Sequence, residues 1–526
     1  MSAPVLDIRG LRVQAMGRAL LDDASIQVQR GQLAGVIGES GAGKSTLGLA
    51  ALGYYRAGCE AVAGQVLLCG TDLRALAVDD VRAVRRRHGA YVAQSAANAF
   101  NPAWRIGDQV LEVRRLAGRD GDEASFLRAL FESLELPDPA VFGRRFPHQV
   151  SGGQLQRAML AMALASEPDL IVFDEPTTAL DVTTQLEVLR TVRSVLRGRG
   201  LAGLYISHDI ALVAQMTDHM LVLRDGRSCE SGPTRRLVDA PSQAYTRALV
   251  AARTANRAQP LAAPARSPRV ALQQVGAGYG RGPLVVRDVS VDLHPGEVLA
   301  VVGQSGSGKS TLARVATGLL APRSGRALLE GELLAPVVEG RTLEQRRRIQ
   351  LVHQSPDASV NPRQRVREIV GRPIEFFFGA APAAVEERTR VLLKDTGLDA
   401  AFMDRLPQTL SGGQKQRMCI ARALAADPDV LVCDEVTSAL DPLIEDSVVE
   451  MLGRVQRQRG LAILFITHNL VLAQRIAHRV LVMRSGEVVE QGTSAAVFEH
   501  PAHPYTRSLL SAVPTLEPGW LERQLV

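Results

Sequence analysis

The sequence predicts an α/β protein that consists of two copies of one domain in tandem. A glycine-rich segment at 38–46 recurs at 303–311, and a second segment at 151–154 recurs at 411–414. Between these segments, short apolar runs bounded by glycine, proline or aspartate alternate with helical patterns, as in buried parallel strands covered by helices. Because the repeated segments keep their order and nearly their spacing, they indicate a duplicated domain rather than a solenoid, whose repeats are far shorter.

The boundary between the two copies falls in residues 253–268, which are rich in alanine, proline and arginine and lack hydrophobic periodicity. This composition is typical of a short linker. A chain of 526 residues is also too long for one hydrophobic core. The predicted organisation is a first domain at 1–252, a linker at 253–268, and a second domain with a C-terminal extension at 269–526.

Composition and charge exclude few classes of function. Lys and Arg exceed Asp and Glu by 61 to 55, a mild excess that suits an anionic partner and equally an ordinary solvated surface. The five cysteines form no Cys-x-x-Cys pair, which argues against zinc, a metal cluster or a disulfide framework. We expect no signal peptide and no membrane span, since the chain has no apolar stretch of about 18 residues. Work at a membrane would therefore proceed from the cytoplasmic side, through partners.

A phosphate-binding loop is predicted in each copy. The pattern Gly-x-x-x-x-Gly-Lys-Ser follows an apolar run at 33–37 and begins a predicted helix at Lys44, which corresponds to Lys309. The glycines permit a tight loop whose amides point inward, and the helix N-terminus adds positive potential. We expect each lysine to neutralise phosphates, and Ser45 and Ser310 to offer a hydroxyl to Mg²⁺. The other loop residues of the two candidate sites are Gly38, Ser40, Gly41, Gly43 and Thr46, and Gly303, Ser305, Gly306, Gly308 and Thr311.

An acidic pair ends an apolar run in each copy, as Asp174 and Glu175 and again as Asp434 and Glu435. A carboxylate at the C-terminal end of a strand, beside a phosphate loop, can hold Mg²⁺ or its water shell. The glutamate that follows can polarise an attacking water as a general base. Such a pair could also merely cap the next helix, but the phosphate loop in each copy favours the catalytic interpretation.

The segments Ser-Gly-Gly-Gln-x-Gln-Arg at 151–157 and 411–417 resemble the signature of the ATP-binding cassette (ABC) family, about 20 residues before each acidic pair. The resemblance covers essentially the whole chain. It implies two tandem ABC-type P-loop NTPase domains, each with a mainly parallel sheet core and a helical subdomain, and it implies ATP and Mg²⁺ as cofactors. The family's further site residues would be Ser151, Gly153, Gln154, Ser411, Gly413 and Gln414 in the signatures, Gln94 and Gln354 in the Q-loops (also toward Mg²⁺), Asp181 and Asp441 in the D-loops, and His208 and His468 as switch histidines.

The same resemblance implies two composite sites, in which the signature helix of one domain faces the phosphate loop of the other. Amide donors at a helix N-terminus would then bind the γ-phosphate, so that ATP joins the two domains and hydrolysis releases them. Lys44 and its neighbours would pair with 411–414, and Lys309 and its neighbours with 151–154. Because each domain has both a glutamate and a histidine, we expect both sites to hydrolyse ATP.

One departure from the family pattern concerns adenine. Cassettes usually stack this base on an aromatic side chain about two dozen residues before the phosphate loop, and Tyr279 fits this role in the second half. The matching positions in the first half are Gln14 or Ala15, and residues 11–20 contain no aromatic residue. The first site is therefore expected to bind nucleotide more weakly, unless an aromatic residue from elsewhere in the fold substitutes.

Two further patterns resemble ATPases of the peptide, opine and nickel uptake branch. They are the runs at 94–102 and 354–362, which both end in Asn-Pro, and the Tyr-Thr-Arg helices at 244–249 and 503–510. The implied function is the ATPase subunit of an importer of a peptide or peptide-like solute, bound peripherally to the cytoplasmic face of the inner membrane. Implied partners are two permeases and an extracytoplasmic solute-binding protein, with no nucleic acid. Because no cysteine follows Cys433, we expect no C-terminal iron–sulfur cluster, although many members of this branch carry one.

Other twin-cassette proteins remain as alternatives. A sugar importer commonly has a degenerate second site, whereas Lys309, Ser411 and Glu435 are all present here. A soluble translation or ribosome factor would suit the basic charge, but it usually has a long charged arm between its domains. A DNA-repair cassette would show zinc-spaced cysteines.

Overall fold

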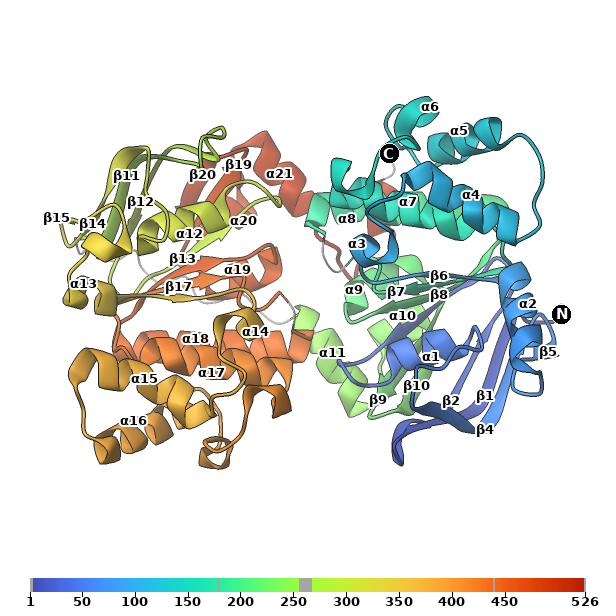
Figure 1. Ribbon diagram of the computed structural model, residues 1–526, viewed down its shortest axis with the longest axis horizontal. Helices are drawn as coiled ribbons and strands as arrows, with labels where there is room; N and C mark the ends of the chain where they lie inside the picture. Colours follow the sequence, from blue (N-terminus) through green and yellow to red (C-terminus); the bar gives the residue numbers. More distant parts are fainter. Residues whose placement is uncertain (1–2, 178–179, 255–266, 439, 525–526) are drawn as a thin grey trace. The chain divides into compact units, whose positions relative to one another are not determined.

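The computed structural model describes residues 3–177, 180–254, 267–438 and 440–524 (Figure 1). The chain divides into two compact units, one formed by Met1–Thr254 with Pro514–Val526 and the other by Ala255–Val513. Each unit is an α/β domain with two sheets, so the predicted duplication and fold class are confirmed. Among the described residues, no helix has the length and apolar character needed to cross a membrane.

The central sheet of the first unit has six strands in the order β10-β9-β3-β8-β7-β6. All neighbouring pairs are parallel except β9 with β10. The bounds are β3 (Leu33–Ile37), β6 (Gly89–Val92), β7 (Leu170–Asp174), β8 (Ala202–Ser207), β9 (His219–Arg224) and β10 (Arg227–Pro233). Every residue of β3, β7 and β8 is buried, which is why these strands read as continuous apolar runs rather than as alternating ones.

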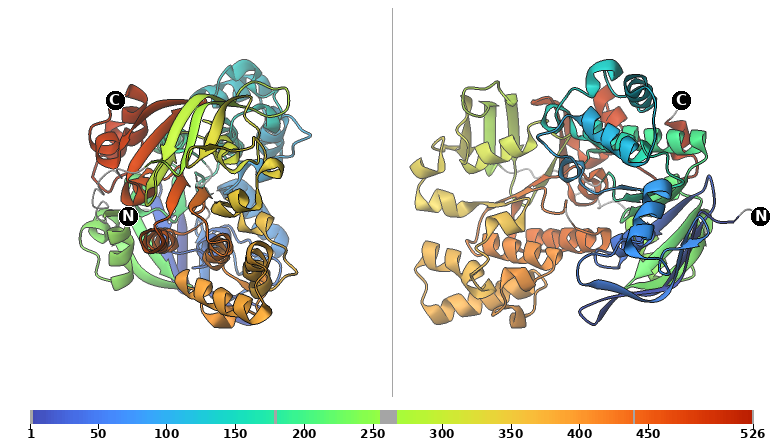
Figure 2. Two further views of the ribbon diagram at one scale, coloured as in Figure 1. Left: turned by 90° about the vertical axis from the view of Figure 1, so that its left-hand side faces the viewer. Right: turned by 45° about the vertical axis from the view of Figure 1, so that its right-hand side comes forward.

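A second, antiparallel sheet in the first unit was not predicted from the sequence. Its strand order is β2-β1-β4-β5, with bounds β1 (Leu6–Ala15), β2 (Arg18–Val28), β4 (Cys59–Leu68) and β5 (Thr71–Asp72). Strand β2 contacts β10, and Figure 2 (right) shows the antiparallel strands in dark blue beside the green ones. One hydrophobic core therefore joins Leu6, Leu11 and Val66 of this sheet with Val36 and Leu204 of the parallel sheet.

Helices cover the sheets and form a helical subdomain, drawn from blue (α4) through cyan (α5, α6) to blue-green (α7) in Figure 1. Within that subdomain α4 packs on α5 and α7, and α5 packs on α6. The helices of the first unit are α1 (Lys44–Ala50), α2 (Val78–His88), α3 (Ala96–Ala99), α4 (Ile106–Leu116), α5 (Glu123–Ser133), α6 (Pro139–Phe142), α7 (Gly152–Leu164), α8 (Val182–Arg199), α9 (Ile210–Met216), α10 (Thr234–Asp239), α11 (Ala244–Thr254) and α22 (Trp520–Arg523).

The second unit repeats this architecture. Its parallel sheet has the order β16-β17-β18-β13-β19-β20 and its antiparallel sheet the order β12-β11-β14-β15. The strands are β11 (Val270–Ala277), β12 (Val286–Leu293), β13 (Val298–Val302), β14 (Ser324–Leu329), β15 (Glu332–Leu333), β16 (Ile349–Val352), β17 (Val430–Asp434), β18 (Ala462–Ile466), β19 (Arg479–Arg484) and β20 (Glu487–Thr493). The helices are α12 (Lys309–Thr317), α13 (Leu343–Arg348), α14 (Pro356–Ser359), α15 (Val366–Phe378), α16 (Pro382–Asp395), α17 (Gly412–Leu424), α18 (Pro442–Arg459), α19 (Leu470–Ile476), α20 (Ser494–Glu499) and α21 (Pro504–Ser511).

The C-terminal segment differs from the predicted domain boundary, since residues from Pro514 onward belong to the first unit. The Gln215 side chain of α9 donates hydrogen bonds to the carbonyls of Thr515 and Glu517, each at 2.7 Å. Trp520 is only 5% exposed. Buried apolar surface and satisfied backbone carbonyls thus hold this segment. At the other boundary, α11 extends to Thr254, two positions into the predicted linker, and 255–266 lie outside the described residues.

Candidate active sites

The phosphate loop of the first unit connects the C-terminal end of β3 to the first turn of α1. Gly43 caps this helix with a positive φ of 94°, and a Cβ at this position would lie 2.6 Å from the carbonyl oxygen of Leu20. Only glycine therefore fits there. The Lys44 side chain is 5% exposed, and its Nζ donates to the carbonyl oxygens of Gly38 at 2.7 Å and Glu39 at 2.9 Å. The loop thus holds a buried ammonium group at its centre.

The second unit builds the same loop between β13 and α12. Lys309 is also 5% exposed, and its Nζ donates to the carbonyl oxygens of Gly303 and Gln304, both at 2.8 Å. Gly308 caps α12 with a φ of 103°. The two loops therefore place their lysines alike, although one has glutamate and the other glutamine as the second loop residue.

The hydroxyl of the first serine in each helix meets the aspartate at the end of the neighbouring strand. Ser45 Oγ donates to Asp174 Oδ1 at 3.0 Å, and Ser310 Oγ donates to Asp434 Oδ1 at 2.9 Å. Burial raises the pKa of Asp434, and the adjacent Glu435 carboxylate adds to the shift. A hydroxyl and a buried or partly buried carboxylate beside a phosphate loop are the hard oxygen donors that suit Mg²⁺.

The glutamate that follows each aspartate is held by two side chains from other segments. Glu175 accepts from Gln94 Nε2 at 3.1 Å, and its Oε2 lies 3.2 Å from His208 Nδ1. Lys44 Nζ lies 3.8 Å from its other carboxylate oxygen. Glu175 has a φ of 49°, a left-handed conformation that is uncommon outside glycine and that occurs at functional sites.

The same constellation occurs in the second unit. Glu435 accepts from Gln354 Nε2 at 2.9 Å, and His468 Nδ1 lies 3.7 Å from its Oε2. Its φ is also 49°. The nearby His468 ring lowers the pKa of Glu435, against the opposing effect of burial. In the first unit burial disfavours the imidazolium form of His208, but Glu175 outweighs this and the pKa of His208 is raised.

Two repeated stretches of the chain match the family described as ABC transporter, at residues 21–178 and 286–438. The chain belongs to the ABC transporter family. Its C-terminal residues 489–526 also match the family described as oligopeptide/dipeptide transporter, C-terminal region. The chain is thus an ATP-hydrolysing subunit of an ABC importer of the peptide type, as the sequence motifs predicted.

Two relatives named as import proteins are similar to this chain over nearly its whole length. The glutathione import ATP-binding protein GsiA of Salmonella choleraesuis is 34% identical over 98% of this chain and 91% of its own length. The protein of the same name from Escherichia coli is 36% identical over 95% of this chain and 87% of its own length. A solved structure, cbiO1 from Clostridium perfringens, described as part of the ABC transporter complex cbiONQ, matches 45% of this chain and 92% of its own chain with 29% identity and a TM-score of 0.42.

The signature segments of this ABC protein form the N-termini of α7 and α17. Ser151 caps α7 through its Oγ, which accepts from the Gln154 amide at 3.3 Å, while Gln154 Oε1 accepts from the Ser151 amide at 3.1 Å. Ser411 and Gln414 form the same reciprocal pair on α17. This capping box fixes where each helix begins, and the first two residues of each segment are exposed. The pairing of these helices with the opposite phosphate loops stays a prediction.

The predicted D-loop aspartates also occupy helix N-termini. Asp181 caps α8 by accepting from the Thr184 amide at 3.1 Å, and Asp441 is the corresponding first residue before α18. The residues just before them, 178–179 and 439, lie outside the described residues.

A tyrosine that was not predicted from the sequence contacts the candidate Mg²⁺ ligand of the first unit. Tyr91 OH donates to Asp174 Oδ2 at 2.6 Å. The corresponding residue in the second unit is Leu351 of β16. Tyr91 pairs with Val172 of β7, and Leu351 pairs with the matching Val432 of β17. The signal was an aromatic residue three positions before the Q-loop glutamine in one copy only. The aspartate is thus more firmly oriented in the first site.

The Tyr-Thr-Arg helices, predicted only as markers of the peptide branch, contact the phosphate loops. The hydroxyl of Tyr245 in α11 accepts from the Glu39 amide at 3.0 Å, and that of Tyr505 in α21 accepts from the Gln304 amide at 3.1 Å. Both tyrosines are less than 10% exposed. The helix after the core of each domain therefore holds the second residue of its phosphate loop.

Each of these helices is in turn fixed by a glutamate. Glu230 in β10 accepts from the Ser242 amide and hydroxyl, at 2.9 and 2.7 Å, and from the Gln243 amide at 3.2 Å. Burial alone would raise the pKa of Glu230, but the nearby Thr246 side chain and the hydrogen bonds from Ser242 and Gln243 outweigh it and lower the pKa to about 2.

The candidate adenine position differs between the two units, as the sequence indicated. Tyr279 follows β11, is 45% exposed, and accepts a hydrogen bond from Arg314 at 3.0 Å, with that guanidinium 5.6 Å from its ring centre. In the first unit Gln14 and Ala15 form the last pairs of β1 with β2 and β4. The role of Tyr279 in stacking stays a prediction.

Proposed function

We propose that the chain drives uptake of a small peptide or peptide-like solute from the cytoplasmic face of a membrane, through two permease subunits and a solute-binding protein. The match to an oligopeptide/dipeptide transporter region supports the solute class. Relatives named for glutathione import, 34–36% identical over nearly the whole chain, favour a solute of tripeptide size.

The observation that supports ATP hydrolysis as the driving reaction is that each unit holds one glutamate between a glutamine and a histidine, beside a lysine in a predicted phosphate loop. Lys44 and Lys309 would bind the β- and γ-phosphates of ATP. Glu175 and Glu435 would accept the proton of the attacking water, and His208 and His468 would contact the γ-phosphate. Because both constellations are complete, both sites would hydrolyse ATP.

Mg²⁺ would be held by Ser45 and Asp174 in one site and by Ser310 and Asp434 in the other, with Gln94 and Gln354 near by. When bound, it neutralises phosphate charge. The signature residues Ser411, Gly413 and Gln414 would complete the Lys44 site, and Ser151, Gly153 and Gln154 would complete the Lys309 site. Such composite sites would explain why a single chain carries two intact cassettes.

A cavity in the first unit is a candidate docking site for a permease. It has a volume of about 450 Å³ and lies among α2, β6, α4 and α7. Val113, Leu116 and Met162 give it an apolar lining, and Arg82, Arg85 and Arg86 give it a basic one. An apolar loop helix with acidic flanks fits this chemistry. Because α3 and α4 follow the Q-loop glutamine Gln94, nucleotide state could reach this cavity mechanically.

The test is reconstitution of the chain in lipid vesicles with the permeases that neighbouring genes encode. We expect ATPase activity to rise when the cognate binding protein carries glutathione or a short peptide, and not when it carries a sugar. A matched chain with Glu175→Gln and Glu435→Gln should lose the activity. Stimulation by ribosomes or by sugar-loaded binding protein alone would overturn the proposal. A cysteine placed at Leu116 tests the docking site, because it should crosslink to permease loops. A cysteine placed at the exposed Met16 is the control and should not.

A further inference from the structure

Three side chains with metal-binding atoms meet in the first unit, away from the ATP site. The ligand atoms of Cys69, His88 and Asp169 all lie within 4.8 Å of one another. Cys69 is in the turn between β4 and β5, His88 ends α2, and Asp169 immediately precedes β7. Asp169 stands at the N-terminal end of the strand whose C-terminal end carries Asp174, so this cluster lies at the opposite edge of the parallel sheet.

The cluster is already ordered by polar contacts. His88 Nδ1 lies 2.7 Å from Asp169 Oδ2, and these side chains are 26% and 24% exposed. The guanidinium of Arg30 binds the other carboxylate oxygen, Oδ1. One oxygen of Asp169 is thus oriented by a neighbour while the other faces the imidazole. This is the arrangement in which an outer partner positions a carboxylate ligand.

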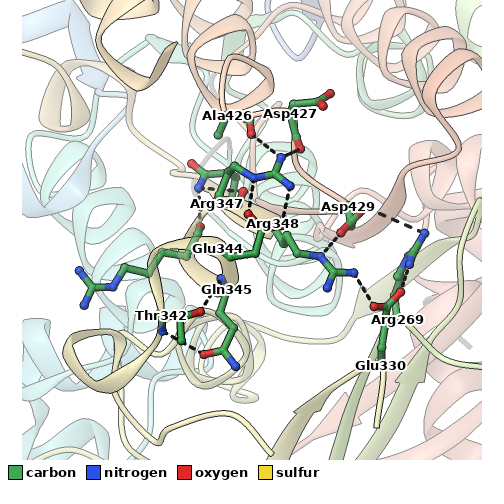
Figure 3. A network of polar contacts seen from close by, with 12 residues as sticks. Arg269, Glu330, Thr342, Glu344, Gln345, Arg347, Arg348, Ala426, Asp427 and Asp429 are labelled. Atoms are coloured by element: carbon green, nitrogen blue, oxygen red, sulfur yellow. Dashed lines mark hydrogen bonds and ion pairs between the residues drawn. The ribbon is translucent and has the colours of Figure 1, made fainter. Parts of the chain in front are cut away.

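The second unit has a charge network at the same three positions (Figure 3). Glu330 and Asp429 both pair with the guanidinium of Arg348, whose NH2 lies 2.7 Å from Glu330 Oε2. Arg269 also pairs with Glu330. This network connects the turn after β14 to the start of β16 and β17, so the antiparallel and parallel sheets are joined by ion pairs.

Backbone hydrogen bonds establish that the positions correspond. The Cys69 amide donates to Val5 at 2.8 Å, as the Glu330 amide does to Arg269 at 2.8 Å. The Asp169 amide donates to the carbonyl of His88 at 3.0 Å, and the Asp429 amide donates to that of Arg348 at 3.0 Å. Cys69 and His88 therefore stand where the second unit has Glu330 and Arg348. In the second unit these two residues form an ion pair between the two sheets.

We propose that Cys69, His88 and Asp169 bind one Zn²⁺ ion, which joins the two sheets of the first unit as the ion pairs do in the second. A thiolate, an imidazole and a carboxylate are the ligand types that zinc prefers. Tetrahedral ligands at about 2.0–2.3 Å from zinc lie roughly 3.3–3.8 Å apart, so side-chain shifts of about 1 Å close the site. Water fills the fourth position. The role is structural, because the site lies at the sheet edge away from the phosphate loop.

The three ligands come from three separate segments, at 69, 88 and 169. The absence of a Cys-x-x-Cys pair excludes the usual zinc motifs, but it does not bear on a site assembled in this way.

The test uses the full chain without nucleotide or affinity tag, titrated with Co²⁺ as a spectroscopic substitute for zinc. We expect one equivalent to bind, with a thiolate-to-cobalt charge-transfer band. Cys69→Ser should remove that band, and His88→Gln, which removes a direct ligand, should weaken binding by at least about 10-fold, the lower end of the loss caused by removing an outer partner of a ligand. Cys229→Ser, which removes another thiol of the same unit, should change nothing.

A double variant, Cys69→Glu with His88→Arg, installs the second unit's ion pairs and separates metal binding from folding. It should bind no cobalt at this site and keep the thermal unfolding midpoint of the metal-free parent. Zn²⁺ should raise that midpoint in the parent and not in the double variant. Lack of cobalt uptake by the parent at 100 μM, about the weakest affinity that would be useful to a folded site, would overturn the proposal. Uptake that is unchanged in Cys69→Ser and in the double variant would overturn it equally.

Discussion

The hydroxyl of Tyr245 accepts a hydrogen bond from the backbone amide of Glu39 at 3.0 Å, although the two residues are 206 positions apart in the chain. It connects α11 to the predicted phosphate loop of the first cassette. Tyr505 makes the equivalent contact with Gln304 in the second cassette. The helix after the core of each domain therefore contacts the candidate nucleotide site.

Tyr245→Phe should weaken ATP binding at the Lys44 site, because the loop amide loses its partner while the ring stays packed. A hydrogen bond of about 0.5–1.5 kcal/mol corresponds to roughly a 2- to 12-fold loss of affinity. Nucleotide titration in a Lys309→Ala background measures this site alone. Tyr505→Phe in the same background is the matched control and should leave the affinity unchanged. An equal loss from both substitutions would contradict the local explanation.

Glu175→Gln with Glu435→Gln should abolish most hydrolysis and keep ATP bound. The amide retains the shape of the carboxylate but cannot accept a proton, and loss of a general base typically costs about 10²- to 10⁴-fold in rate. Steady-state phosphate release and nucleotide retention on the chain are the measurements. Turnover at the parent rate would show that neither glutamate is the base.

The two sites should bind nucleotide unequally, with the Lys44 site weaker. Stacking of adenine on an aromatic ring contributes about 1–3 kcal/mol, or roughly 5- to 150-fold in affinity. Tyr279→Ala should loosen the Lys309 site, and Gln14→Tyr or Ala15→Tyr should tighten the Lys44 site, each measured with the other site disabled. Equal affinities that none of these substitutions moves would show that stacking does not distinguish the halves.

Glu230 should stabilise the first unit in a pH-dependent way. Its folded pKa of about 2 lies below the ordinary value of 4.5, so its contribution is fully present above about pH 4.5 and is lost as the pH falls toward 2. Glu230→Gln should therefore lower the unfolding midpoint at pH 6, and the difference from the parent should shrink on acidification. A difference that is the same at pH 6 and pH 3 would contradict the role of the charge.

Trp520→Ala should destabilise the first unit, because the ring is 5% exposed and its removal leaves a cavity. Deletion of a buried tryptophan side chain costs about 3–5 kcal/mol. Limited proteolysis, with fragments assigned to each unit by mass, measures where the chain opens. Preferential cleavage within the second unit would contradict the prediction that Trp520 stabilises the first unit.

Elements with strong local signals were predictable from the sequence. The strand at 33–37 and the helix that begins at Lys44 occur with the predicted bounds. The antiparallel sheet was missed, because β1 contains a bulged register and an uneven burial pattern. The hydrogen bond from Tyr91 to Asp174 joins residues 83 positions apart, and the one from Gln215 to Glu517 joins residues 302 positions apart. No local periodicity encodes such pairs.

Because the C-terminal segment packs on the first unit, that unit can complete its folding only after the whole chain has been synthesised. Gln215 and Thr515, which are hydrogen-bonded, are 300 positions apart. At about 5–20 residues per second, a ribosome needs roughly 15–60 s to cover that distance. During this interval the first cassette has its phosphate loop and sheets but not the segment that covers α9. The second cassette must be made before the first is finished, so the two mature together although they are encoded one after the other.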